Sequence, residues 1–161
     1  MIRYARQSDH AAIGEVVAQA FGAEAEAHLV ERLRAEGDVL FELVAVAEDV
    51  VTGHILFSRL WADRYEMYAA LAPLAVRPHL QRSGLGSALV RAGLESAREF
   101  GVHGVLVLGQ PEYYGRFGFS PEAARQVQAP YAGSPSFMAL ALEPGAFGAP
   151  LSVAYPDAFG G

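Results

Sequence analysis

A proline interrupts the run Tyr68 to Val76, which otherwise has the apolar pattern of a strand inside a sheet. Proline has no backbone N–H, so it removes a hydrogen bond from the ladder and is confined to edges, bulges and strand starts. Pro73 therefore predicts a bulge here, or a parting of this strand from its neighbour. A parted strand leaves backbone groups of Leu74, Ala75 and Val76 unpaired. An extended ligand that carries amides could pair with them like an added strand.

A glycine-rich turn follows a few residues later and leads directly into a helical pattern. Its sequence is Gln81-Arg82-Ser83-Gly84-Leu85-Gly86. Glycine lets the backbone approach a ligand closely, successive N–H groups converge, and a helix N-terminus carries about half a positive charge. Arg82 adds a full charge, so the turn predicts a site for a pyrophosphate. The alternative is that Gly84 and Gly86 form a tight turn and nothing more.

Two other phosphate-binding patterns do not match this turn. A dinucleotide-binding fingerprint requires Gly-x-Gly-x-x-Gly or Ala in a first βαβ unit, whereas the run here is Gly84-Leu85-Gly86-Ser87-Ala88-Leu89. A Walker loop requires a lysine, and all 12 basic residues of this chain are arginine.

Composition narrows the chemistry further. The 161 residues are 52% hydrophobic and 19% charged, which predicts one packed domain over residues 1–161. There is no cysteine, which excludes a thiolate zinc site and a cysteine nucleophile, and the five histidines lack metal-ligand spacing, so we expect no metal. A net charge of −6 argues against nucleic acid as a partner. Without a long apolar run or a signal-like N-terminus, we expect a cytoplasmic protein and no membrane contact.

Apolar periodicity and turn residues predict a single mixed α/β or α+β domain. Antiparallel strands come first, and a strand-helix-strand unit follows. The predicted helices cover residues 24–36 and 85–100, with an earlier one starting after Ser8-Asp9, which supplies N-cap chemistry. A glycine turn at 49–53 is expected to join the first two strands of a hairpin. The predicted strands cover residues 2–6, 40–48, 54–60, 68–76, 104–108, 137–142 and 151–155.

The glycine-rich turn resembles the acetyl-CoA signature Gln/Arg-x-x-Gly-x-Gly/Ala of the GNAT N-acetyltransferase superfamily. Tyr114, four residues before Gly118-Phe119, matches that family's Tyr-x-x-x-Gly-Phe pattern. The stretch Gly109 to Phe119 is most similar to the YhbS-like branch. The resemblance covers residues 2–119 in element order, with specific motifs from residue 71 onward. It implies the acyl-CoA N-acyltransferase fold: a mixed, mostly antiparallel central sheet, flanked by helices, whose bulged central strand parts from the next strand.

The resemblance also implies acetyl-CoA as cosubstrate. Its pantetheine amides would pair with the strand after Pro73, its pyrophosphate would bind the N–H groups of the turn, and Tyr114 would lie near the thioester sulfur. Many members carry an asparagine after the strand that ends at Leu108, where this chain has Gly109-Gln110-Pro111. The implied cofactor-binding residues are Leu74, Ala75, Val76, Gln81, Arg82, Ser83, Gly84, Leu85, Gly86, Ser87 and Tyr114.

Under this interpretation an amine attacks the thioester directly, because the chain has no cysteine to carry an acyl group. The reaction needs an unprotonated amine, a backbone N–H for the developing oxyanion and a proton for the leaving thiolate. Tyr114 is the candidate acid, with packing against neighbouring aromatics as the alternative. Glu66 is the first candidate base, followed by Glu42 and His54, and a water chain is the alternative to all three.

The sequence supports more than one function. The leading hypothesis is an acetyl-CoA-dependent N-acetyltransferase that acts on a primary amine of a small molecule or peptide, as a monomer or homodimer. A catalytically silent acyl-CoA-binding sensor module is the alternative, and a scaffold domain is the third. Aromatic residues of the second half could line an acceptor pocket, although such residues are more often core. They include Tyr131, Phe137 and Tyr155.

Overall fold

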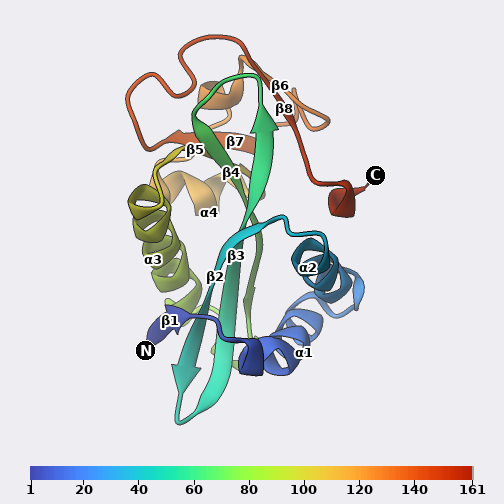
Figure 1. Cartoon of the computed structure of the whole chain (residues 1–161). Coiled ribbons are helices and arrows are strands. Elements are labelled where there is room, and N and C mark those ends of the chain that lie inside the picture. The colour runs from blue at the N-terminus through green and yellow to red at the C-terminus, as the bar shows by residue number, and fades with distance from the viewer. Residues whose placement is uncertain (161) are drawn as a thin grey trace.

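The computed structural model describes residues 1–160 and contains a mixed, mostly antiparallel sheet with helices on both faces (Figure 1). The main strand order is β1-β2-β3-β4-β5-β7, in which only the β4–β5 pair is parallel. This architecture confirms the predicted fold class. The strands are β1 (Ile2–Tyr4), β2 (Val39–Ala47), β3 (Val50–Ala62), β4 (Met67–Val76), β5 (Val102–Leu108), β6 (Val127–Gln128), β7 (Phe137–Ala141) and β8 (Leu151–Ala154). The helices are α1 (His10–Phe21), α2 (Ala25–Ala35), α3 (Leu85–Glu99) and α4 (Pro111–Tyr114).

The helices cover the two faces of the sheet unequally. α1 and α2 pack on one face, where Ile13 and Leu33 meet apolar side chains of β2 and β3. α3 packs on the other face through Leu89 and Leu94 (Figure 1). A third apolar cluster lies under β6 and β8, which pair with each other, and β8 also pairs with the end of β3. None of the helices formed by residues 1–160 is long and apolar enough to cross a membrane.

The hairpin between β2 and β3 turns at a different place from the one that the glycine predicted. Glu48 and Asp49 form the turn, with φ values of 50° and 63°. Gly53 instead lies inside β3, where a Cβ atom would come within 2.8 Å of the Leu89 side chain on α3. The prediction of a glycine turn was wrong because this glycine serves helix packing, and the turn is made by Glu48 and by Asp49, a residue type that tolerates the left-handed region.

The start of α1 also differs from the expected cap. Asp9 precedes the helix, but its carboxylate makes no cap hydrogen bond to α1. It accepts hydrogen bonds from the Arg3 guanidinium, at 2.7 and 3.1 Å, and from the backbone N–H of Arg6. The side chain therefore ties β1 to the chain that leads into α1.

The strand that holds Pro73 is both bulged and parted. Between the pairs Phe57–Leu71 and Ile55–Leu74, β4 has two residues where β3 has one, which defines a β-bulge. On its other edge, β4 pairs with β5 only as far as Leu71, opposite Val107. Both expectations drawn from Pro73 are confirmed, because a residue without an N–H sits where the ladder ends.

Candidate functional site

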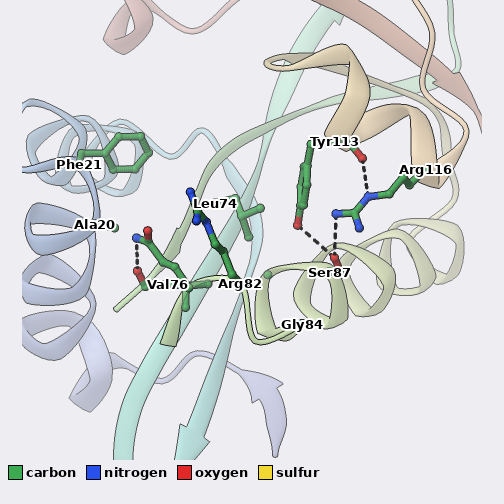
Figure 2. A pocket seen from close by; sticks show the side chains of 11 residues that line it. Ala20, Phe21, Leu74, Val76, Arg82, Gly84, Ser87, Tyr113 and Arg116 are labelled. Atoms are coloured by element: carbon green, nitrogen blue, oxygen red, sulfur yellow. Dashed lines mark hydrogen bonds between the residues drawn. The ribbon is translucent and has the colours of Figure 1, made fainter. Parts of the chain in front are cut away.

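A cavity of about 530 Å³ lies beside the parted half of β4, at the start of α3 (Figure 2). β4 and the glycine-rich turn form its floor, the end of α1 lies on one side, and α4 with the turn that follows it lies on the other. The lining residues are Ala20, Phe21, Leu74, Val76, Gln81, Arg82, Gly84, Gly86, Ser87, Tyr113 and Arg116.

The glycine-rich turn presents the N-terminus of α3 to this cavity. Arg82 and Gly84 have φ values of 64° and 90°, so the chain folds tightly just before α3. The first N–H groups of a helix have no acceptor inside it, and they are available to an anion. A Cβ atom on Gly86 would lie 3.1 Å from the Tyr113 hydroxyl and 3.7 Å from Val76. A glycine here keeps the cavity open at the helix N-terminus.

The far half of β4 has a free edge. The N–H of Arg77, just after β4, donates to a carbonyl of β3 at 3.0 Å. Since strand backbone groups alternate between the two sides, those of Ala75 also face β3, and those of Leu74 and Val76 face away from it. The Gln81 side-chain amide donates to the Val76 carbonyl at 3.0 Å. The backbone groups left open to a ligand are therefore the N–H and the carbonyl of Leu74 and the N–H of Val76.

Two predicted turn residues lie outside the cavity lining. The Ser83 hydroxyl donates to the Leu80 carbonyl and closes the turn. Leu85 packs against the core under α3. Their backbones shape the loop, whereas the side chains that reach the cavity from it are those of Gln81, Arg82 and Ser87.

Four lining residues were missed by the sequence analysis: Ala20, Phe21, Tyr113 and Arg116. The Arg116 guanidinium lies 4.6 Å from the centre of the Tyr113 ring and donates to the Ser87 hydroxyl at 3.4 Å (Figure 2). The spacing of Tyr113 and Arg116, three residues apart on short helical turns, was the available signal. Nothing local marks Ala20 and Phe21, since they reach the site only through the packing of α1.

A second cavity, of about 430 Å³, opens where β4 and β5 separate. It shares Phe21 and Leu74 with the first cavity, so the two lie next to each other. Tyr114 lines it, and a Cβ atom on Gly109 would lie 2.5 Å from the Tyr114 ring. The glycine after β5 therefore lets this ring pack against the strand end. Burial, followed by the neighbouring Tyr113, raises the pKa of Tyr114 to about 12, so its phenol holds its proton at neutral pH.

The geometry is that of an elongated site with a glycine-rich turn and the N-terminus of a helix at one end and a tyrosine at the other. A family model described as the acetyltransferase (GNAT) family matches residues 10–119. The chain belongs to the GNAT acetyltransferase family.

Curated relatives and solved structures agree with this assignment. The Escherichia coli K12 protein YjhQ, an uncharacterized N-acetyltransferase, is 41% identical over 132 residues, which are 78% of this chain and 72% of YjhQ. YhbS of the same organism, also an uncharacterized N-acetyltransferase, is 34% identical over 138 residues, 84% of this chain and 83% of YhbS. The predicted membership and its YhbS-like character are confirmed.

Two solved structures of GNAT proteins superpose closely. The crystal structure of Escherichia coli YhbS in complex with CoA has a TM-score of 0.91 at 33% identity, covering 99% of this chain and 91% of YhbS. A GNAT acetyltransferase from Brucella melitensis in complex with acetyl-CoA has a TM-score of 0.83 at 33% identity, covering 99% of this chain and 97% of the other.

In this GNAT chain, Glu66 lies far from Tyr114. It occupies the exposed turn between β3 and β4 and lines a separate surface hollow with Ala62 to Tyr65. Pro73, which lines the second cavity together with Tyr114, comes seven residues after Glu66. At the rise of an extended strand, this separation corresponds to about 20 Å. The structure therefore does not bring the first candidate base together with the candidate acid.

The other two candidate bases hold each other. The side chain of His54 is fully buried, and its Nε2 lies 2.8 Å from the Glu42 carboxylate. Arg34 of α2 donates two hydrogen bonds to the same carboxylate, at 2.7 and 2.9 Å. Neither His54 nor Glu42 lines the two cavities. We assign this network a structural role, because it fixes α2 to β2 and β3.

Proposed function

We propose that this GNAT chain transfers an acetyl group from acetyl-CoA to a primary amine of a small molecule or peptide by direct attack, without an acyl-enzyme. The observation that carries the proposal is the parting of β4 from β5 beside the N-terminus of α3. Membership of the GNAT family supports the reaction type. The complexes of YhbS with CoA and of the Brucella melitensis protein with acetyl-CoA support the choice of cosubstrate.

The residues present fit such a molecule along its length. The free edge of Leu74 and Val76 suits a chain that carries amides, because it offers both a donor and an acceptor. The α3 N-terminus suits a pyrophosphate, and Arg82 adds a positive charge beside it. Gly86 keeps space where a side chain would intrude between Tyr113 and Val76.

The chemistry requires little of the protein beyond positioning. The amine nitrogen bonds to the acetyl carbon, the carbon–sulfur bond breaks, and the electron pair leaves on the thiolate. A backbone N–H at the free edge of β4 stabilises the charge that develops on the carbonyl oxygen. The sulfur takes a proton, which we assign to the Tyr114 hydroxyl, and the amine loses one to water, through which the Tyr114 oxygen regains its proton.

Calorimetry with acetyl-CoA, CoA and pantetheine tests the binding part of this proposal. Gly86→Glu places a side chain and a negative charge in the first turn of α3. The helix dipole tolerates an acid there, so the fold is expected to persist, while acetyl-CoA affinity falls at least tenfold. Ala11→Glu is the matched control, because it adds the same charge to the exposed first turn of α1, outside the cavity.

The outcomes separate the candidate functions. Weaker binding of pantetheine than of CoA, or weaker binding of acetyl-CoA by Gly86→Glu, supports the cofactor site. Release of CoA from acetyl-CoA when an amine is added then supports the transferase. Tight binding with no turnover on any amine tested favours the acyl-CoA-binding sensor. Equal affinity in Gly86→Glu and Ala11→Glu would place the ligand elsewhere on the molecule.

A further inference from the structure

Within residues 1–160, the second cavity is lined mostly by apolar side chains and carries a single charged one. Among the described residues that line it, Glu26 of α2 is the only charged one. It forms no ion pair with any of residues 1–160. The rest of the lining is backbone, aliphatic side chains and aromatic rings, with no arginine or histidine. A ligand that enters this cavity therefore meets one carboxylate and no basic side chain.

Aromatic residues from the end of the chain form one wall. The Tyr131 and Tyr155 rings are 5.2 Å apart in an edge-to-face arrangement, and the Tyr155 and Phe159 rings are 5.4 Å apart in another. Burial, and then the neighbouring Tyr131, raises the pKa of Tyr155, so this phenol remains neutral. Rings packed in this way offer apolar faces and edges to an apolar or aromatic ligand.

A second wall comes from the first two helices. Phe21 ends α1, and Leu29 lies one turn after Glu26 on α2. The short helical turn Asp157–Phe159 packs near α2, so the last residues described by the structure close the cavity beside this wall. Tyr114 and the parted strands form its inner end. The cavity thus runs from the helices to the point where β4 and β5 separate.

We propose that the acceptor is a small primary amine on an apolar or aromatic body, with no carboxylate beside the amine, and that Glu26 recognises its ammonium form. This inference rests on the proposed acetyl transfer and names its substrate class. The single carboxylate complements a cation, and the rings accept the body of the ligand. A volume of about 430 Å³ suits a small molecule. An α-amino acid would bring a carboxylate into a cavity without a basic side chain, next to Glu26.

Matched ligands test the inference. Phenethylamine and phenylalanine differ only by a carboxylate, and phenylalaninamide keeps the bulk of that group without its charge. We expect kcat/KM for phenethylamine to exceed that for phenylalanine by at least tenfold, with phenylalaninamide in between. Putrescine, which has a second cation and no ring, is expected to be a poorer acceptor than phenethylamine. Phenylalanine or putrescine used as well as phenethylamine would overturn the inference, and acetyl transfer itself would still stand.

Glu26→Gln tests the role of the carboxylate. We expect KM for phenethylamine to rise about tenfold with a smaller change in kcat, since a charge-assisted hydrogen bond is lost. The preference for phenethylamine over phenylalanine should narrow at the same time, which a purely structural role would not produce. Glu24→Gln is the control, because it removes the same charge from an exposed residue of the same segment that does not line the cavity.

Direct binding keeps the inference testable without turnover. Calorimetric titration of phenethylamine into the chain, and into Glu26→Gln, measures the affinity of the second cavity for the amine. This measurement does not require acetyl-CoA to bind. Binding by the native chain that weakens in Glu26→Gln supports recognition of the ammonium by Glu26, even if no acetyl transfer is found. Equal binding of phenethylamine and phenylalanine, or no effect of Glu26→Gln, would refute it.

Discussion

At the scale of single residues, Tyr113 and Tyr114 are adjacent but lie in different cavities. Tyr113 faces the start of α3, with its hydroxyl 3.4 Å from that of Ser87. Tyr114 faces the parted strands. With a pKa of about 12, the Tyr114 phenol is a weaker acid than a thiol, whose pKa is about 8.5. The proton it offers a thiolate therefore helps only modestly.

Tyr114→Phe is expected to lower kcat about tenfold, below the usual effect of about 10² to 10⁴ for loss of a general acid. Acetyl-CoA affinity should stay within about twofold. Tyr113→Phe is the matched change in the other cavity, and there we expect weaker acetyl-CoA binding with kcat little altered. Steady-state kinetics with calorimetry separates the two. An unchanged kcat in Tyr114→Phe would assign the proton to water.

At the scale of elements, α3 approaches the sheet more closely than ordinary side chains allow. A Cβ atom on Gly93 would lie 2.5 Å from the Phe57 ring, which is fully buried and stacked on Phe41 at 4.8 Å. Gly53 of β3 meets Leu89 in the same interface. These two glycines set the distance between helix and sheet, and so the position of the α3 N-terminus beside β4.

Gly93→Ala is therefore expected to destabilise the fold, although alanine favours helices over glycine by about 1 kcal/mol. Overpacking a tight core costs about 1 to 3 kcal/mol, so we expect a net loss of about 1 kcal/mol in the free energy of unfolding. Gly14→Ala is the control, because a Cβ atom on this α1 glycine meets nothing within 4 Å. It should stabilise the chain by up to about 1 kcal/mol. Denaturant unfolding measures both variants, and the same sign in both would contradict this account.

At the scale of the whole molecule, the buried network of Arg34, Glu42 and His54 joins α2 to the sheet. Burial opposes ionisation of Glu42, but hydrogen bonds from His54 and Arg34 outweigh it and lower the pKa of Glu42 to about 2. Burial also lowers the pKa of His54, although Glu42 opposes that shift. A carboxyl with a lowered pKa stabilises the fold above its unfolded pKa of about 4.5, and this contribution is lost as pH falls toward 2. A histidine buried neutral acts in the same direction, since the fold loses stability as pH falls below about 6.5.

Stability is thus expected to fall steadily on acidification, by about 3 kcal/mol from Glu42 alone between pH 5 and 2. Arg34→Leu should destabilise the fold by about 3 kcal/mol near neutral pH and move acid unfolding to higher pH, because it leaves a buried carboxylate short of a partner. Arg32→Leu is the control on the same helix, since its pair with Glu36 is exposed and contributes under about 0.5 kcal/mol. Chemical unfolding at several pH values tests this, and equal effects of the two variants would argue against it.

Much of the fold could be predicted from local patterns. Each strand and helix predicted from periodicity is present, with ends that differ by a few residues. The bulge and the parting of strands at Pro73 follow from the missing N–H of proline. The turn at Gly84 before α3 uses the positive φ that glycine adopts without strain. Gly53 was misassigned, because a glycine required by a neighbouring helix has the same local pattern as one required by a turn.

The sequence by itself determined the element order, the break in the ladder and the glycine-rich turn before the helix, since each depends on residues close together in the chain. The tertiary structure decided which distant side chains share a cavity. It separated Glu66 from Tyr114, kept Glu42 and His54 in a structural network, and brought Glu26 to the site. The physical reason is that helix packing and the return of the last residues against α2 set these neighbours. Contacts between residues more than 100 positions apart have no local signal in the sequence.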